Sequence, residues 1–152
     1  SIGTATATAI TIAKSGVATT IAGTLTVSQA ATFTGNITIN GHLVGGGTTP
    51  SIAAGSAACT TPTVSVTGSD TSGTITVTTG SGCSGGGKLS TITFGSAYGA
   101  APRITLTPAG AAAAGLTTYI DDATISTTAF DLGTSTTPTD ATTYKWYYHA
   151  IQ

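Results

Sequence analysis

The stretch Tyr144-Lys145-Trp146-Tyr147-Tyr148-His149-Ala150-Ile151-Gln152 decides the fold. A strand places alternate side chains on opposite faces, so Tyr144, Trp146, Tyr148 and Ala150 share one face. That aromatic face is typical of the wall of a β-sandwich core. The opposite face is too apolar for free solvent and too polar for a core. We therefore expect it to contact a second subunit through Tyr147, His149 and Ile151.

The composition of the chain predicts an all-β protein. Only 6% of the 152 residues are charged, and the formal net charge is −1. Thr, Gly, Ala and Ser dominate, while helix formers other than Ala are nearly absent. The chain has no cluster of basic residues, which argues against a nucleic-acid partner. No apolar run approaches the length of a membrane helix, so we expect no membrane insertion.

The two cysteines, Cys59 and Cys83, lie in turn-rich segments on either side of a predicted hairpin. In a chain rich in Ser and Thr and poor in charge, they are interpreted as one disulfide made in an oxidising compartment. The alternative is a pair of buried free thiols. The disulfide predicts an extracellular, cell-surface or virion location.

Residues 1–47 are repetitive. After a short alternating unit at residues 10–12, the units Ile21-Ala-Gly-Thr-Leu-Thr-Val27 and Phe33-Thr-Gly-Asn-Ile-Thr-Ile39 follow each other twelve residues apart. Each unit predicts one short strand that cannot bury its apolar face alone. This pattern resembles the shaft repeats of trimeric phage tail fibres and related bacterial surface fibres. The resemblance implies that three chains meet through Ile21, Leu25, Val27, Phe33, Ile37 and Ile39.

The run Gly45-Gly46-Gly47-Thr48-Thr49-Pro50 marks the predicted boundary between this shaft or arm and a head at residues 48–152. In the head, strands are expected at short, regular spacing, which favours an antiparallel sandwich. The Ala-rich segment 109–115 is expected to form an exposed loop or a single helical turn. The predicted strands are 63–67, 74–79, 89–94, 103–107, 117–120, 129–133 and 143–151.

A second resemblance rests on the order Phe94-x3-Tyr98-x3-Pro102-x-Ile104-x-Leu106, then Thr127-x2-Phe130-x-Leu132, then Tyr144-x-Trp146-x-Tyr148-x-Ala150. This order is similar to that of the H-type lectin domain and of lectin-like tips of phage fibres. The resemblance covers about residues 88–152. It implies a small β-sandwich that forms trimers and binds sugars.

Sugar-binding sites use aromatic rings that stack on the sugar and polar neighbours that bind its hydroxyls. The candidates are Tyr98 and Tyr119, with Arg103, Asp121 and Asp122 as polar partners. For each of these residues the alternative is an ordinary core, interface or turn position.

The sequence gives little support for phosphate binding, metal binding or catalysis. Residues 82–88 match the GxxxxGK part of a phosphate-binding loop, but Leu89 stands where a Ser or Thr is needed and a strand follows. Three copies of His42 or His149 could hold a metal or an anion on a trimer axis, although surface or interface histidines are the simpler interpretation. The chain has no Glu for a carboxylate pair and no nucleophile elbow. We expect no enzyme activity, no cofactor and no metal.

Two main functions follow from these observations, beside a third interpretation as a secreted enzyme accessory domain that binds polysaccharide. The first is the distal part of a trimeric extracellular or virion fibre whose lectin-like head binds a surface glycan. The alternative is a self-assembling pilus or filament subunit, whose N-terminal arm adds a strand to the neighbouring subunit. Both readings make another copy of the chain the main partner.

Overall fold

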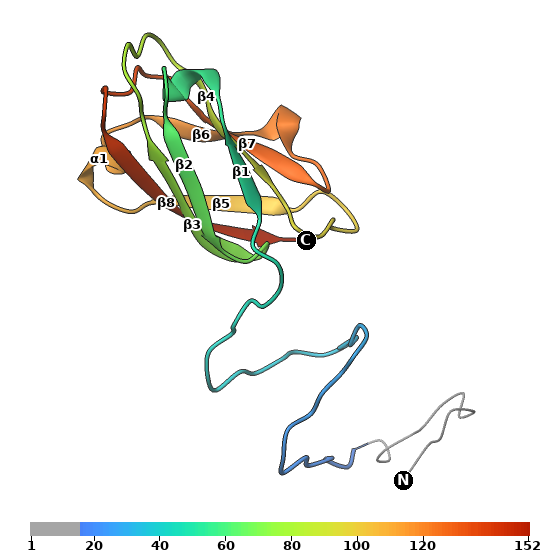
Figure 1. Cartoon of the computed structure of the whole chain (residues 1–152). Helices are drawn as coiled ribbons and strands as arrows, with labels where there is room; N and C mark the ends of the chain where they lie inside the picture. Colours follow the sequence, from blue (N-terminus) through green and yellow to red (C-terminus); the bar gives the residue numbers. More distant parts are fainter. Residues whose placement is uncertain (1–15) are drawn as a thin grey trace. The chain divides into compact units, whose positions relative to one another are not determined.

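The computed structural model describes residues 16–152 and divides the chain into two units, residues 1–41 and residues 42–152 (Figure 1). The division falls close to the glycine run at residues 45–47. The expected unit at residues 10–12 lies outside the described residues. All strands of the described part belong to the second unit.

Eight strands form two four-stranded sheets, and every pairing between neighbouring strands is antiparallel. One sheet has the order β1-β4-β7-β6 and the other β2-β3-β8-β5. A single helical turn, α1, connects β5 to β6. The bounds are β1 Ser51–Ala54, β2 Thr63–Gly68, β3 Ser72–Thr78, β4 Gly87–Thr93, β5 Arg103–Pro108, α1 Ala111–Ala114, β6 Thr118–Asp121, β7 Ala129–Thr134 and β8 Thr143–Ile151.

The all-β prediction is confirmed, and each of the seven expected strands is present. The strand that the sequence did not predict is β1, which pairs with β4 at the edge of its sheet. Its four residues contain only one large apolar side chain, Ile52, so they lack the alternation that marks a strand.

β8 is a central strand between β3 and β5, and its side chains alternate between buried and exposed as expected. Tyr144, Trp146, Tyr148 and Ala150 are at most 3% exposed, whereas Tyr147 and Ile151 are 58% and 56% exposed. The inner face of β8 packs in one core with Ile92, Phe130 and Leu132 of the other sheet. The ring centroids of Phe130 and Tyr148 lie 6.2 Å apart, within the range of favourable aromatic pairs. The two sheets therefore share one core that the closing strand anchors.

The loop between β2 and β3 is fastened to the end of the sandwich. The Tyr148 hydroxyl donates a hydrogen bond to the Ser69 carbonyl, which is buried. The Asp70 carboxylate accepts from the amides of Gly95 and Ser96, and the Tyr98 hydroxyl donates to the Asp70 carbonyl. These bonds hold the loop against the segment that follows β4.

Replacing Tyr148 with phenylalanine is expected to lower the free energy of unfolding by about 1–3 kcal/mol near neutral pH, because the Ser69 carbonyl loses its donor. Burial is the largest cause that raises the pKa of Tyr148 to about 12 from its ordinary 10.0, with smaller contributions from Asp70 and Tyr98. The stabilisation from this group is therefore complete below the unfolded pKa of about 10 and is lost as the pH rises through about 12. Urea unfolding followed by Trp146 fluorescence at increasing alkaline pH measures both effects.

Tyr147→Phe is the matched control for this measurement, since the Tyr147 ring is on the exposed face of the same strand. Its free energy of unfolding is expected to stay within about 0.5 kcal/mol of the parent chain. An alkaline loss of stability that persists unchanged in Tyr148→Phe contradicts the assignment to Tyr148.

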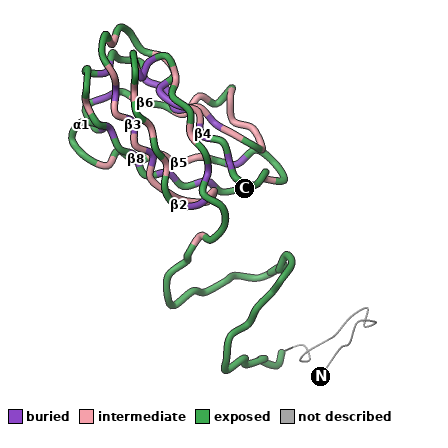
Figure 2. The backbone as a smooth tube through the Cα atoms, viewed as in Figure 1, coloured by how far each residue is buried: buried purple, intermediate pink, exposed green. Residues whose placement is uncertain are grey.

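Residues 16–41 contain no helix or strand, and every residue from Gly16 to Val44 is exposed (Figure 2). The strands expected at residues 21–27 and 33–39 are thus not formed within one chain. Isolated strands leave their backbone groups and apolar faces unpaired, which makes them unstable without neighbouring strands. None of the helices described for residues 16–152 is long and apolar enough to cross a membrane.

Candidate functional site

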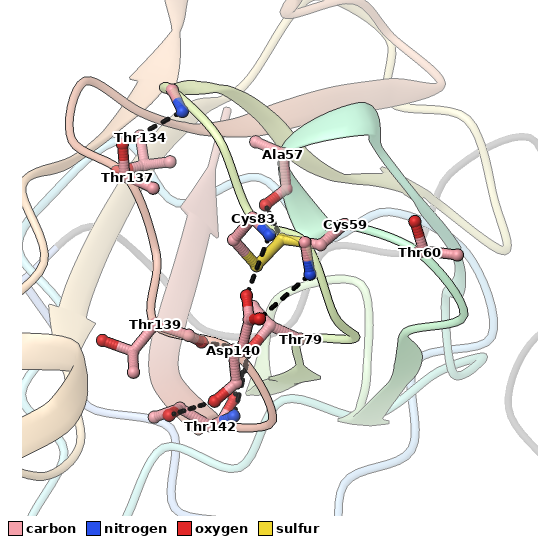
Figure 3. Close-up of a disulfide and its surroundings, with 12 residues drawn as sticks. Ala57, Cys59, Thr60, Thr79, Cys83, Thr134, Thr137, Thr139, Asp140 and Thr142 are labelled. Atoms are coloured by element: carbon pink, nitrogen blue, oxygen red, sulfur yellow. Dashed lines mark hydrogen bonds between the residues drawn. A yellow bond between two sulfur atoms is a disulfide. The ribbon is translucent and has the colours of Figure 1, made fainter.

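A disulfide between Cys59 and Cys83 closes one end of the head, with 5.0 Å between the two Cα atoms (Figure 3). The Asp140 carboxylate lies against this turn and accepts hydrogen bonds from the amides of Gly82 and Cys83, at 3.0 and 2.8 Å. These amides, that of Cys83 foremost, hold the pKa of Asp140 below its ordinary value. The disulfide turn is thereby tied to the segment between β7 and β8.

The segment 135–142, called here the β7–β8 loop, is held by several further bonds. The Thr79 hydroxyl contacts the carbonyls of Thr139 and Thr142 at 2.6 and 3.1 Å. The Gly85 amide donates to the Thr137 hydroxyl, and the Tyr144 hydroxyl accepts from the Thr139 amide. The loop therefore has a fixed conformation, although it contains no regular secondary structure.

A cleft of about 390 Å³ lies between the β7–β8 loop and α1. One wall consists of small or apolar residues, the other of hydroxyl groups. None of the lining residues carries a charge. They are Ala111, Ala112, Gly115, Leu116, Thr136, Thr137, Thr139, Thr142 and Tyr144.

The residue types of this cleft, called here the threonine cleft, fit a neutral ligand with hydroxyl groups. Threonine and tyrosine hydroxyls both donate and accept hydrogen bonds, as the hydroxyls of a polyol do. The opposite wall offers apolar contact at Ala111, Ala112 and Leu116. Small-molecule sites commonly combine apolar walls with a few polar groups in clefts of about 300–1,000 Å³.

A second cleft, of about 240 Å³, lies beside Tyr98 and is lined by Gly46, Gly47, Thr48, Asp70, Thr71, Ser96, Ala97 and Tyr98. Both carboxylate oxygens of Asp70 already accept backbone hydrogen bonds. The Tyr98 hydroxyl donates to the Asp70 carbonyl, and burial raises the Tyr98 pKa. The Asp70 carboxylate and the Tyr98 hydroxyl of this smaller cleft are thus already engaged within the fold.

The residues predicted to bind carbohydrate do not meet at one place. Tyr119 and Asp121 belong to the edge strand β6, and Asp122 begins the 3₁₀ turn that follows it. Arg103 belongs to β5 of the other sheet, and Tyr98 lines the smaller cleft. None of these five residues lines the threonine cleft.

Local contacts already account for two of these residues, Tyr119 and Asp121. The Tyr119 ring covers Gly133 of the neighbouring strand, where an added Cβ atom would lie 2.6 Å from the ring. The Asp121 carboxylate caps the 3₁₀ turn by accepting from the Ala123 amide. On the same sheet, Asp131 contacts Lys88 at 3.4 Å and accepts from the Thr91 hydroxyl at 2.5 Å.

The phosphate-loop match at residues 82–88 has a structural explanation. The amides of Gly82 and Cys83 face the Asp140 carboxylate, a negative group that would repel a phosphate. Lys88 lies in β4 and pairs with Asp131. This segment is a disulfide-closed turn, and the amides of Gly82, Cys83 and Gly85 already donate to side chains of the β7–β8 loop.

The subunit contact predicted for the outer face of β8, and the interface positions predicted for His42 and His149, stay predictions. His149 lies on the outer sheet face, opposite Ser72 of β3 and Thr105 of β5. Tyr147 lies in a cross-strand row with Thr74 and Thr107. Within residues 16–152, no group of three or more His, Cys, Asp or Glu side chains is arranged to hold a metal ion.

The sequence could not reveal the threonine cleft. Most of its hydroxyls belong to the commonest polar residue type of the chain, and the alternation along residues 144–150 places Tyr144 in the core. The only available signal was the Thr136-Thr137-Pro138-Thr139 cluster beside the aromatic strand. Comparison of the chain with protein-family models, curated proteins and solved structures found no match.

Proposed function

We propose that this chain is a structural attachment protein, the distal part of an extracellular or virion fibre. Its N-terminal unit assembles with copies of itself, and its β-sandwich head contacts a carbohydrate on a target surface. The observation that carries the proposal is the unburied apolar surface of residues 16–44. These residues expose nine large apolar side chains, between 50% and 82% each: Val17, Ile21, Leu25, Val27, Phe33, Ile37, Ile39, Leu43 and Val44.

Leaving the apolar side chains of this segment exposed to water is energetically unfavourable. Burying one side chain such as Leu or Phe contributes about 1.5–3 kcal/mol, and soluble monomers rarely leave apolar residues clustered on their surface. Segments that stay disordered are instead poor in apolar residues and rich in charge. Residues 16–44 contain no Asp, Glu, Lys or Arg. This composition favours burial against a partner.

A second copy of the same chain is the partner that suits this segment best. The units at residues 21–27 and 33–39 share one pattern, so identical chains place the same apolar residues opposite each other. The segment has no charges with which to select a different, charged partner. Its backbone, unpaired in the single chain, can form strand pairs with other copies. The resemblance to trimeric fibre shafts supports a closed assembly of three chains.

The disulfide of the head supports an extracellular location. Its disulfide is of the kind that persists in oxidising compartments. The outer face of the β2-β3-β8-β5 sheet exposes Tyr147 and Ile151 beside a row of threonines. We propose that this face contacts neighbouring heads in the assembly.

The mass of the purified full chain in solution tests the proposal. Light scattering or native mass spectrometry should give three chains per particle. An open-ended polymer would replace the fibre with the filament reading, in which the N-terminal segment is donated to a neighbouring subunit. A single chain at micromolar concentration contradicts both.

A further inference from the structure

We infer that the threonine cleft is the saccharide-binding site of the head and that it accepts a neutral sugar residue. This inference deepens the proposed attachment function and rests on it for its biological role. The binding itself can be measured separately from assembly. The cleft is the larger of the two described above, and the sequence predicted none of its residues as a site.

The first support is unused hydrogen-bonding capacity at the cleft wall. The Tyr144 hydroxyl accepts from the Thr139 amide at 2.8 Å, and its own proton has no acceptor among residues 16–152. Tyr144 is only 3% exposed, so this hydroxyl is held at the cleft by a buried side chain. The Thr137 hydroxyl likewise accepts from the Gly85 amide at 3.0 Å and has no protein acceptor for its proton in the described part. Both groups are available to donate to a ligand oxygen.

The second support is the arrangement of the two walls. A sugar ring has apolar C–H faces and a rim of hydroxyls. The apolar wall, with Ala111, Ala112 and Leu116, can contact a C–H face of the sugar. The hydroxyls of Thr137, Thr139 and Tyr144 can form hydrogen bonds with the sugar hydroxyls. A purely apolar ligand would leave the hydroxyls unpaired, which is unfavourable in a desolvated site.

Charge selects a neutral sugar over an acidic one. No lining residue is basic, so a carboxylate or sulfate group on the sugar would find no counter-charge. Asp140 lies in the same loop between Thr139 and Ala141, and its carboxylate is held in the ionised form by the Gly82 and Cys83 amides. An anionic sugar in the cleft would therefore experience repulsion.

The third support is rigidity. The β7–β8 loop is fastened to Thr79, to the disulfide turn through Asp140 and to Gly85 through Thr137. A site whose side chains are already ordered loses less conformational entropy when it binds. The loop thus presents its hydroxyls without a further folding step.

The test is binding of the full chain to an array of immobilised neutral and sialylated oligosaccharides. We expect retention on neutral glycans and a weaker signal when the same glycan ends in sialic acid. Binding to sialylated glycans alone overturns the inference, and so does an absence of binding across the array.

Two substitutions on α1 locate the site. Ala112 is an exposed residue of the α1 wall, so the larger side chain of Ala112→Trp would occupy the cleft. We expect it to weaken glycan binding by at least about tenfold, because a sugar no longer fits. Ala114→Trp is the matched control, because Ala114 is exposed on the same helical turn but does not line the cleft. Its affinity should stay within about twofold of the parent chain. Equal affinities for the two variants overturn the assignment to this cleft.

Tyr144→Phe adds a finer readout, since it keeps the ring but removes the unpaired donor, together with the acceptor of the Thr139 amide. We expect a loss of about three- to tenfold in affinity, the usual effect of one hydrogen bond. Unchanged affinity contradicts the role given to this hydroxyl. Mass measurement of the same samples keeps the two proposals apart. A trimer that binds no glycan overturns the cleft inference and the carbohydrate contact of the head but leaves the fibre assembly in place, and a single chain that binds neutral glycans overturns only the assembly.

Discussion

Leu25→Asp combined with Ile37→Asp is expected to convert the full-length assembly into single chains. Both side chains are exposed in the single chain, at 63% and 59%, and both belong to the repeat units that we propose to pair between copies. In a buried interface each aspartate would have to lose its hydration without a counter-charge, which costs several kcal/mol. Since each chain carries both substitutions, a closed assembly of three would bring together many like charges. Analytical ultracentrifugation of the parent and variant chains measures the result.

Thr26→Asp combined with Thr38→Asp is the matched control. Thr26 directly follows Leu25, and Thr38 directly follows Ile37. In a strand, neighbouring side chains point to opposite faces, so both threonines lie on the face opposite the apolar residues. This variant introduces the same charge into the same units and should retain most of the assembled mass. If both double variants dissociate to the same extent, net charge rather than the apolar face is responsible. If neither dissociates, the segment is not the assembly element.

The head should remain folded in these variants, because its core contains no residue from the repeat units. The near-ultraviolet circular dichroism of the buried aromatic residues checks this. A change in that signal together with dissociation would mean that the substitutions act through the fold of the head.

The strand β8 shows what the sequence could predict. Aromatic residues at every second position have one arrangement that removes them from water, a strand with one buried face. Tyr144, Trp146 and Tyr148 are accordingly buried, and Tyr147 between them is exposed. The pattern could not predict the neighbours of β8. These depend on pairings such as that of Tyr148 with Leu106, residues far apart in sequence.

The candidate site shows the opposite case. The sequence groups Tyr119 and Arg103 because both are polar or aromatic residues outside the expected core, yet they lie on different sheets. The threonine cleft is formed where α1 meets a loop that comes after β7. The Thr-Pro cluster at residues 136–139 is too weak a pattern to separate Thr137 and Thr139 from the many other threonines. The site could be found only after the fold had brought its two walls together.

The link between the disulfide and this loop was equally hidden. The spacing of Cys59 and Cys83 around a hairpin predicted their pairing. The role of Asp140, 57 residues beyond Cys83 in the chain, depends on the return of β8 to the same end of the head. A lone aspartate in a Thr-rich segment gives no sign of this contact.

Replacing both cysteines with alanine is expected to lower the free energy of unfolding of the head by about 3 kcal/mol. The disulfide spans 24 residues, and a loop of that size constrains the unfolded chain by about this amount. The loss corresponds to a decrease of roughly 10 °C in Tm for a domain of this size. Urea unfolding monitored by Trp146 fluorescence measures it. The parent chain under reducing conditions should match the variant, and the variant should not respond to the reductant.

The same Cys59→Ala, Cys83→Ala variant should also weaken glycan binding, although neither cysteine lines the cleft. The amides of Gly82 and Cys83 anchor Asp140, and the Gly85 amide anchors Thr137, so a loosened turn releases the wall that carries the hydroxyls. We expect a loss of about three- to tenfold at a temperature where the variant is still folded, because the loop must then be ordered on binding. A variant that is less stable by 3 kcal/mol but binds neutral glycans as tightly as the parent would show that the disulfide supports the fold and has no part in shaping the site.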